Sequence, residues 1–133
     1  MNYWILKTEP STYSFETLLK DKKTRWDGVR NYQARNNLRL MKVGDLAVIY
    51  HSGDVKSAVG LSKVIKIAYK DPTSPDDWAA INLEVVKAFK RPVTLTEMKA
   101  DSLLKNMILV RQSRLSVSPL TKEEYNSLFK LGF

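Results

Sequence analysis

The sequence contains no cysteine, a single histidine and only five glycines. Without cysteine the chain cannot form disulfides, zinc fingers, iron–sulfur clusters or a thiol nucleophile. A zinc site would need mostly carboxylate ligands beside His51, an unusual donor set for zinc, so we expect no metal and no other cofactor. The few glycines form neither a dinucleotide-binding loop nor a Walker loop, which argues against a nucleotide-hydrolysing enzyme.

Long apolar runs are also absent. No segment approaches the roughly 18 consecutive apolar residues of a membrane-spanning helix. Residues 1–7 lack the basic region and apolar core of a secretory signal. We therefore expect no membrane partner and a cytoplasmic chain, or a nuclear one in a eukaryotic cell. The 133 residues suffice for one domain, spanning residues 1–133, and nothing in them demands more than a monomer.

Basic residues are in excess and unevenly distributed. Lysine and arginine number 22 against 14 acidic residues, a net charge of +8, which favours a polyanionic partner such as nucleic acid. Eight of the basic residues fall between residues 20 and 42, among aromatic and amide side chains. Arginine holds phosphate, an aromatic ring stacks on a base and an amide reads a base edge. The alternative is a solvated charge run, but this mixture favours a nucleic-acid surface that includes Trp26, Arg30, Asn31, Tyr32 and Arg35.

Alternating apolar residues predict strands through the middle of the chain. Strands are expected over five segments, residues 3–7, 45–51, 59–69, 81–89 and 115–118. The longest alternation predicts a half-buried strand whose core-facing residues share one parity, namely Val59, Leu61, Ile65, Ile67 and Tyr69.

Helices are expected mainly at the edges and the end of the chain. The segments 94–97 and 121–124 each match a capping box, and residues 14–20 are expected to form one or two helical turns. Trp4 should lie in the core, and Trp78 should pack the acidic, proline-containing loop before it against the domain. Central strands with short flanking helices predict an α+β fold around a curled antiparallel sheet.

Two groups of polar residues interrupt apolar segments. Lys7, Thr8 and Glu9 end the first strand, and Arg111–Ser116 follows an apolar stretch. Each group is either an ordinary strand exit or loop, or the rim of a binding site. In the second case Lys7, Thr8 and Glu9 face a cavity, while residues 112–114 offer donors and acceptors to a base edge and a phosphate.

His51 stands beside Ser52 at the end of an expected strand, which raises the question of a catalytic triad. The sequence has no nucleophile elbow to hold such a serine. A lone histidine at a strand end is more often a hydrogen-bonded structural residue. We therefore expect no catalytic residues here.

Five segments, in order, resemble signature blocks of the EVE domain family. They are residues 3–10, 25–37, 41–45, 50–52 and 111–117, and together they cover nearly the whole chain. The resemblance implies a PUA-like fold, a small, partly open antiparallel β-barrel flanked by short helices. It also implies a binding module that takes a flipped, modified base from DNA or RNA, with modified cytosine the usual candidate.

The resemblance also implies which residues form the base pocket. In the related YTH pocket an aromatic residue stacks on the modified base, and Trp26 best matches that role. Residues of the other blocks are expected at the pocket or its rim. The complete set of expected base- and nucleic-acid-binding residues is Lys7, Thr8, Trp26, Arg30, Asn31, Tyr32, Arg35, Tyr50, His51, Ser52, Gln112, Ser113 and Arg114.

The sequence departs from the family pattern at a few points. Phe15 stands where a tryptophan is frequent, Ser118 where a glutamine is frequent, and the loop at residues 71–79 is short. These differences touch the rim or the packing. The long basic N-terminal extension of the nuclear members is absent, which favours a bacterial-type chain.

Two other functions are left open. In the ASCH group, which is also PUA-like, amidohydrolases use a lysine, a threonine and a glutamate, and Lys7, Thr8 and Glu9 supply these types. Neighbouring residues of a regular strand alternate faces, however, so we do not expect all three in one pocket. The second alternative is a protein-interaction module whose basic face meets an acidic partner.

Overall fold

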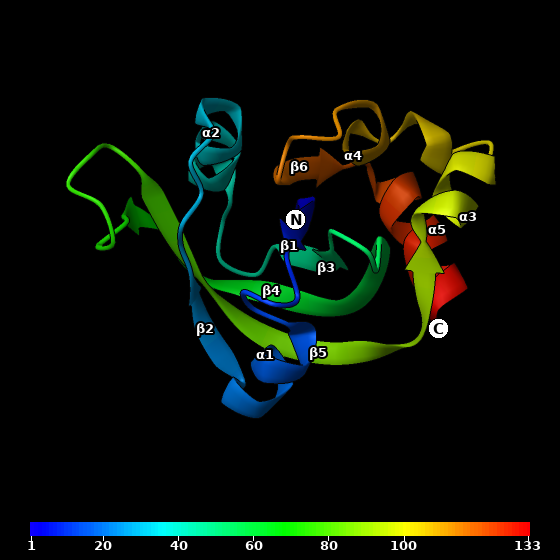
Figure 1. The fold of residues 1–133 in the computed structure, drawn as a ribbon, viewed down its shortest axis with the longest axis horizontal. Coiled ribbons are helices and arrows are strands. Elements are labelled where there is room, and N and C mark those ends of the chain that lie inside the picture. The colour runs from blue at the N-terminus through cyan, green and yellow to red at the C-terminus, as the bar shows by residue number, and fades with distance from the viewer.

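The computed structural model describes all residues from Met1 to Phe133. Its elements occur in the order β1 (Tyr3–Thr8), α1 (Phe15–Asp21), β2 (Lys23–Trp26), α2 (Tyr32–Leu40), β3 (Leu46–His51), β4 (Ser57–Lys70), β5 (Ala79–Thr94), α3 (Leu95–Ala100), the 3₁₀ helix η1 (Leu104–Asn106), α4 (Ile108–Arg111), β6 (Val117–Leu120) and α5 (Lys122–Gly132). The long strands β4 and β5 curve across the molecule (Figure 1). Helix α2 stands above one part of the sheet, and α3 and α5 lie together beyond the end of β5.

All six strands belong to one mixed sheet in the order β2-β5-β4-β3-β1-β6. The edge strands β2 and β6 do not pair with each other, so the sheet stays open. The expected α+β fold with a curled, partly open sheet is therefore confirmed. The expectation of a purely antiparallel sheet is wrong for one pair, because β1 and β3 run parallel. A parallel pair needs a long crossover, which here contains α1, β2 and α2.

Strand β4 changes the face that it buries along its length. Leu61 is buried as expected, but Ile67 is 56 % exposed, and Val64, of the opposite parity, is fully buried. The register of β4 against β5 shifts at four points. Each shift by one residue exchanges the inner and outer faces of a strand. The strand was thus predicted correctly, whereas the single buried face was not.

The helix starts follow their sequence signals. Thr94 and Thr121 each form a complete capping box, and α1 lies where helical turns were expected. Helix α2 was not predicted, although the Asn31 side chain caps it and Ala34 and Leu38 lie four residues apart on its buried face. None of the helices has both the length and the apolar character needed to cross a membrane.

Two apolar clusters fill the two sides of the sheet. Alternate residues of β1 contribute to both, with Leu6 in the cluster near α1 and α2 and Ile5 in the cluster near α3 and α5. Trp4 is buried in the first cluster, which confirms its expected core position. Trp26, the last residue of β2, belongs to the same cluster. The aromatic residue expected to contact a base is therefore also anchored in the core.

Candidate nucleic-acid interface

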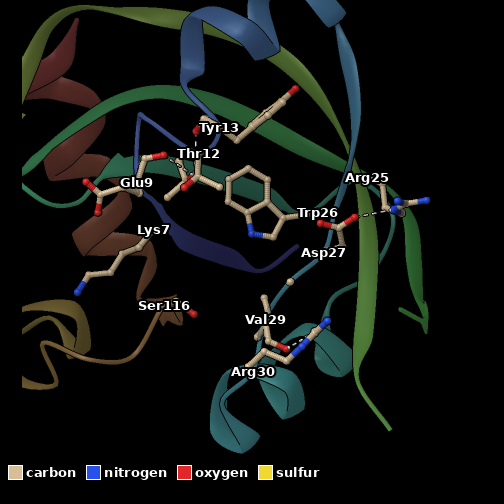
Figure 2. A pocket seen from close by; sticks show the side chains of 12 residues that line it. Lys7, Glu9, Thr12, Tyr13, Arg25, Trp26, Asp27, Val29, Arg30 and Ser116 are labelled. Carbon is tan, nitrogen blue, oxygen red and sulfur yellow. Dashed lines mark hydrogen bonds and ion pairs between the residues drawn. The ribbon is translucent and has the colours of Figure 1, made fainter. Parts of the chain in front are cut away.

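A cavity of about 380 Å³ opens between the end of β1 and the connection from β2 to α2 (Figure 2). Cavities that bind small ligands have volumes of about 300–1,000 Å³, so this one is large enough for a small aromatic ligand. Three segments supply its lining. These residues are Lys7, Thr8, Glu9, Thr12 and Tyr13 from the end of β1 and the turn after it, Arg25, Trp26, Asp27, Gly28, Val29 and Arg30 from β2 and its connection to α2, and Ser116.

Trp26 forms an aromatic wall of this cavity. Its indole extends across the centre of the site toward Thr12, in Figure 2. Only 7 % of the residue is exposed. The Tyr13 ring meets the indole edge to face, with 6.2 Å between ring centroids and 90° between planes. The structure thus brings Trp26 to the site expected of it, while its contact with a base stays a prediction.

Asp71, from the loop between β4 and β5, forms hydrogen bonds with the segment that follows Trp26. One carboxylate oxygen of this fully buried residue accepts hydrogen bonds from Gly28 N and Arg30 Nη1, both at 2.9 Å. The other accepts from Thr73 N and Oγ1, at 2.7 and 2.6 Å. Burial alone would raise the pKa of Asp71, but the hydrogen bonds from Thr73, Gly28 and Arg30 outweigh it and hold the pKa well below its usual range. Asp71 is therefore a carboxylate at neutral pH.

A polar wall of the cavity comes from the end of β1. Thr8 Oγ1 donates to Tyr13 O at 2.8 Å, and Ser52 Oγ lies 3.4 Å from Glu9 Oε2, at hydrogen-bond distance. Lys7 Nζ donates to Ser113 O at 2.5 Å, and burial lowers the pKa of this ammonium group. The cavity therefore presents hydroxyl, carboxylate and ammonium groups beside an indole.

The expectation that Lys7, Thr8 and Glu9 cannot share a cavity is wrong. All three line it, because β1 ends at Thr8 and the chain turns at Glu9. The carbonyl of Glu9 accepts from Thr12 N and Tyr13 N at 2.9 and 3.0 Å, which closes that turn. The alternation rule applies only within a regular strand, and here Thr8 is the last residue of β1 and Glu9 lies outside it.

Several expected site residues lie in a second hollow of about 300 Å³. Its lining consists of Asn31, Gln33, Arg111, Gln112, Ser113, Arg114 and Leu115. The hollow adjoins the cavity along the chain, because Arg30 and Ser116 line one and their neighbours Asn31 and Leu115 line the other. Asn31 has a structural role as well, since its Oδ1 accepts from Ala34 N at 2.9 Å and caps α2.

Tyr32 and Arg35 lie on the outer surface of α2. Tyr32 is 68 % exposed and stacks on Trp78, with ring centroids 5.2 Å apart. The Arg35 guanidinium lies 5.0 Å from the Tyr32 centroid and donates to Asp77 O at 3.2 Å. Trp78 thus packs the loop before it against α2, as expected.

The basic segment, residues 20–42, carries less unpaired positive charge than its sequence suggested. All four of its arginines have a carboxylate partner. Arg25 pairs with Asp27, Arg30 with Asp71, and both Arg35 and Arg39 with Asp77. Two of these three acids come from the loop between β4 and β5, so their position could not be predicted from the local sequence.

The structure does not bring Tyr50 and His51 to the cavity. Both are buried, and Tyr50 packs in the second apolar cluster. His51 Nε2 accepts a hydrogen bond from Phe15 N at 3.0 Å, which supports the structural interpretation of this residue. Ser52, next along the chain, reaches the edge of the site through Glu9.

We predict that His51 makes stability depend on pH between about 5 and 7.5. Burial lowers the pKa of His51, although Glu16 opposes this, and the bond from Phe15 N requires an unprotonated Nε2. Protonation therefore favours the unfolded chain, so the stabilisation is complete above the unfolded pKa of about 6.5 and is lost as the pH falls below it. Denaturant unfolding at both ends of this range should show the loss in the wild type. His51→Gln keeps an acceptor but does not titrate, so its free energy of unfolding should be nearly the same at both pH values. If this variant loses as much stability at low pH as the wild type, His51 is not the cause.

Some cavity residues were missed by sequence reasoning. Glu9 stood in a recognised block and was considered as a rim residue, but it was left out of the expected binding set, because strand alternation argued against it. Asp27 and Ser116 also stood in recognised blocks but were not singled out, whereas Thr12 and Tyr13 lie outside the blocks and carried no signal of their own. Of the expected residues, Lys7, Thr8, Trp26 and Arg30 line the cavity.

Known proteins are similar to this chain over nearly its whole length. A family model described as the EVE domain matches residues 2–131. Human thymocyte nuclear protein 1 is 36 % identical over 165 residues, an alignment that covers 98 % of this chain and 73 % of the human protein. The crystal structure of a protein from Agrobacterium tumefaciens has a TM-score of 0.94 at 39 % identity, covering 99 % of this chain and 93 % of the other.

A further similar structure contains a ligand. It is human THYN1 protein in complex with 5-methylcytosine-containing DNA, with a TM-score of 0.90 and 35 % identity over 99 % of this chain and 98 % of the human one. The family match spans nearly all residues, and the sequence blocks, the sheet and the relatives agree. This chain belongs to the EVE domain family.

Proposed function

We propose that this chain, acting as a single domain over residues 1–133 and as a monomer, binds DNA that carries a modified cytosine. The modified base would leave the helix and enter the cavity beside Trp26. One observation carries the proposal: the cavity of about 380 Å³ combines an indole wall with hydroxyl, ammonium and carboxylate groups. The complex of human THYN1 with 5-methylcytosine-containing DNA, a protein 35 % identical to this chain, supports it.

The cavity offers what a nucleobase requires. The face of a base stacks on an aromatic ring, which contributes about 1–3 kcal/mol and offsets much of the few kcal/mol needed to extract the base. The exocyclic amine of cytosine is a donor, and Glu9 supplies a carboxylate acceptor. The carbonyl oxygen O2 and the ring nitrogen N3 of cytosine are acceptors, and Lys7 and Thr8 supply donors. One buried methyl group adds about 0.8 kcal/mol, so we expect a several-fold preference for the methylated base.

A protein with this function has to share a compartment with DNA. That compartment is the cytoplasm in a bacterium and the nucleus in a eukaryotic cell. Matched RNA probes belong in the same experiment, because base stacking and edge contacts do not depend on the sugar.

The test is a fluorescence-polarisation titration against short probes that differ in one base. The probes carry cytosine, 5-methylcytosine or thymine at the same position, in DNA and in RNA. Thymine has the same methyl group as 5-methylcytosine but an oxygen in place of the amine and a protonated N3, so it reverses the donor and acceptor pattern that Glu9, Lys7 and Thr8 would meet. We expect 5-methylcytosine to bind several-fold tighter than cytosine and about 5- to 150-fold tighter than thymine, the range that one edge contact supports.

Glu9→Ala should reduce the discrimination against thymine, to the part that the N3 position contributes, and leave the preference for the methyl group. Glu123→Ala is the matched control, because it removes the same charge from an exposed position on α5. Equal binding of all probes by the wild type would contradict a base pocket and leave only a basic surface.

A second function has one observation in its favour. Lys7, Thr8 and Glu9 all line the cavity, which is the residue set of the ASCH-type amidohydrolases. Such an enzyme would hydrolyse an N-acetylated cytidine to cytidine and acetate. The test is to incubate N4-acetylcytidine with the protein and to look for cytidine by chromatography. Release of cytidine by the wild type, abolished in Glu9→Ala, would establish the hydrolase.

A further inference from the structure

The arginines of this protein divide into two groups. Five of the seven, including Arg91 with Glu97 at 2.6 Å, pair with a carboxylate. Arg111 and Arg114 do not. The Arg111 guanidinium group donates only to Asn106 Oδ1, at 2.7 Å, and the Arg114 side chain makes no hydrogen bond or ion pair within the chain. These two guanidinium groups line one and the same hollow, beside the cavity.

The chemistry of this hollow suits an oxyanion. No acidic residue lines it, and its remaining polar lining consists of amide side chains and one hydroxyl, from Ser113. A guanidinium group presents a planar fork of donors that matches phosphate, and it keeps its charge at all physiological pH values. Helix α2 begins at the edge of the hollow and adds the positive end of its dipole.

The hollow is also joined to the cavity. Two stretches of chain, Arg30–Asn31 and Leu115–Ser116, pass directly from one to the other. The Lys7 ammonium group, in the cavity, bonds the carbonyl of Ser113, in the hollow. A base in the cavity would therefore direct its neighbouring phosphate toward Arg111 and Arg114.

We propose that Arg111 and Arg114 form a phosphate subsite for the phosphodiester next to the base held in the cavity. This inference rests on the proposed function and makes it more specific. The ligand is then a nucleotide within a strand, not a free base or nucleoside. The two arginines without a carboxylate partner lie in this hollow, whereas the arginines of residues 20–42 each have one.

The experiment places a neutral linkage in the probe. Single-stranded DNA probes with one 5-methylcytosine carry a methylphosphonate either beside that base, on its 5′ or its 3′ side, or several nucleotides away. For the wild type we expect one of the two adjacent substitutions to weaken binding about tenfold and the distant one to weaken it less than twofold. With Arg111→Gln and Arg114→Gln combined, the adjacent substitution should cost less than twofold. Both side chains are exposed, so this variant should fold normally.

Arg91→Gln is the matched control. It removes an arginine that already has a partner, and it should respond to each probe as the wild type does. In the double variant, the slope of log affinity against log salt should fall in magnitude by about 0.7 for each single-strand phosphate that the protein no longer neutralises. An unchanged slope together with an unchanged response to the adjacent methylphosphonate would overturn the subsite.

Other outcomes separate this inference from the proposed function. If the preference for 5-methylcytosine persists but the neutral linkage acts equally on both proteins, the phosphate subsite alone is wrong. If the preference is absent with every probe, the base pocket is wrong. Saturation of the hollow by millimolar inorganic phosphate, with no competition against the DNA probe, would overturn the subsite in favour of a site for free phosphate.

Discussion

Trp26→Ala should lower the free energy of unfolding by about 3–5 kcal/mol, the cost of deleting a large aromatic side chain from a core. The residue is only 7 % exposed and belongs to the cluster shared by α1, α2 and the sheet. A loss of this size is a large fraction of the 5–15 kcal/mol that typically stabilises a domain. Chemical denaturation followed by circular dichroism measures it directly. A loss below about 1 kcal/mol would mean that the indole is not packed as the structure has it.

The same residue needs a gentler substitution to test binding. Trp26→Phe keeps an aromatic ring and most of the packing but reduces the area available for stacking. We expect it to weaken binding of the 5-methylcytosine probe several-fold, because stacking contributes about 1–3 kcal/mol per base. The measurement is the same polarisation titration, at a temperature where unfolding curves show the variant fully folded.

Trp4→Phe provides the matched control. Trp4 lies in the same cluster, is also buried and donates its Nε1 hydrogen to Asp45 Oδ2 at 3.0 Å, but it does not line the cavity. It should lose stability and keep its affinity for the probe. If both variants lose affinity in proportion to their loss of stability, the Trp26 ring has no separate role in binding.

Local patterns predicted the local structure of this protein well. The capping boxes at Thr94 and Thr121 were readable because every contact lies within four residues. Alternation located β4 for the same reason. The parallel pairing of β1 with β3 and the bulges of β4 were not readable, because they depend on which strands meet and on how the long strands bend.

The same distinction applies to the site. Trp26 and Arg30 were identified from the composition of a single stretch and from the family blocks. The role of Asp71 was not identified, because its hydrogen-bond partners Arg30 and Gly28 lie 41 and 43 positions away from it in the sequence. The carboxylate partners of the basic segment were missed in the same way. Charge counted along the sequence therefore overstated the free positive charge near α2 and gave no reason to single out Arg111.

Asp71→Asn should both destabilise the protein and weaken its binding to DNA. The buried carboxylate of Asp71 accepts four hydrogen bonds, two on each oxygen. Asparagine replaces one oxygen by an NH₂ group that faces the former donors, so two of those donors lose their acceptor. We expect a loss of about 2–4 kcal/mol at neutral pH, since a buried unpaired group costs about 1–3 kcal/mol and one of the donors here is charged.

The pH dependence of this effect has a definite sign. The pKa of Asp71 lies well below its unfolded value of about 3.9, so its stabilisation is complete above that value and is lost as the pH falls further. The difference between wild type and Asp71→Asn should therefore be constant from neutral pH down to about 5 and shrink only in stronger acid. A difference that already shrinks between pH 7 and 5 would contradict the ionised, hydrogen-bonded carboxylate.

Measuring DNA binding separates the effect of Asp71 on the shape of the cavity from the effect of its charge. Removal of a negative charge should by itself strengthen attraction to a polyanion, and Asp76→Asn, in the same loop but exposed and without an ion pair, measures that gain. Asp71→Asn removes the same charge but also releases Gly28 and Arg30, which follow Trp26 in the cavity wall. We expect Asp71→Asn to bind the 5-methylcytosine probe several-fold more weakly than the wild type, although the loss of a negative charge alone would strengthen binding. If it binds as tightly as Asp76→Asn while folded, the loop does not hold the cavity in its binding form.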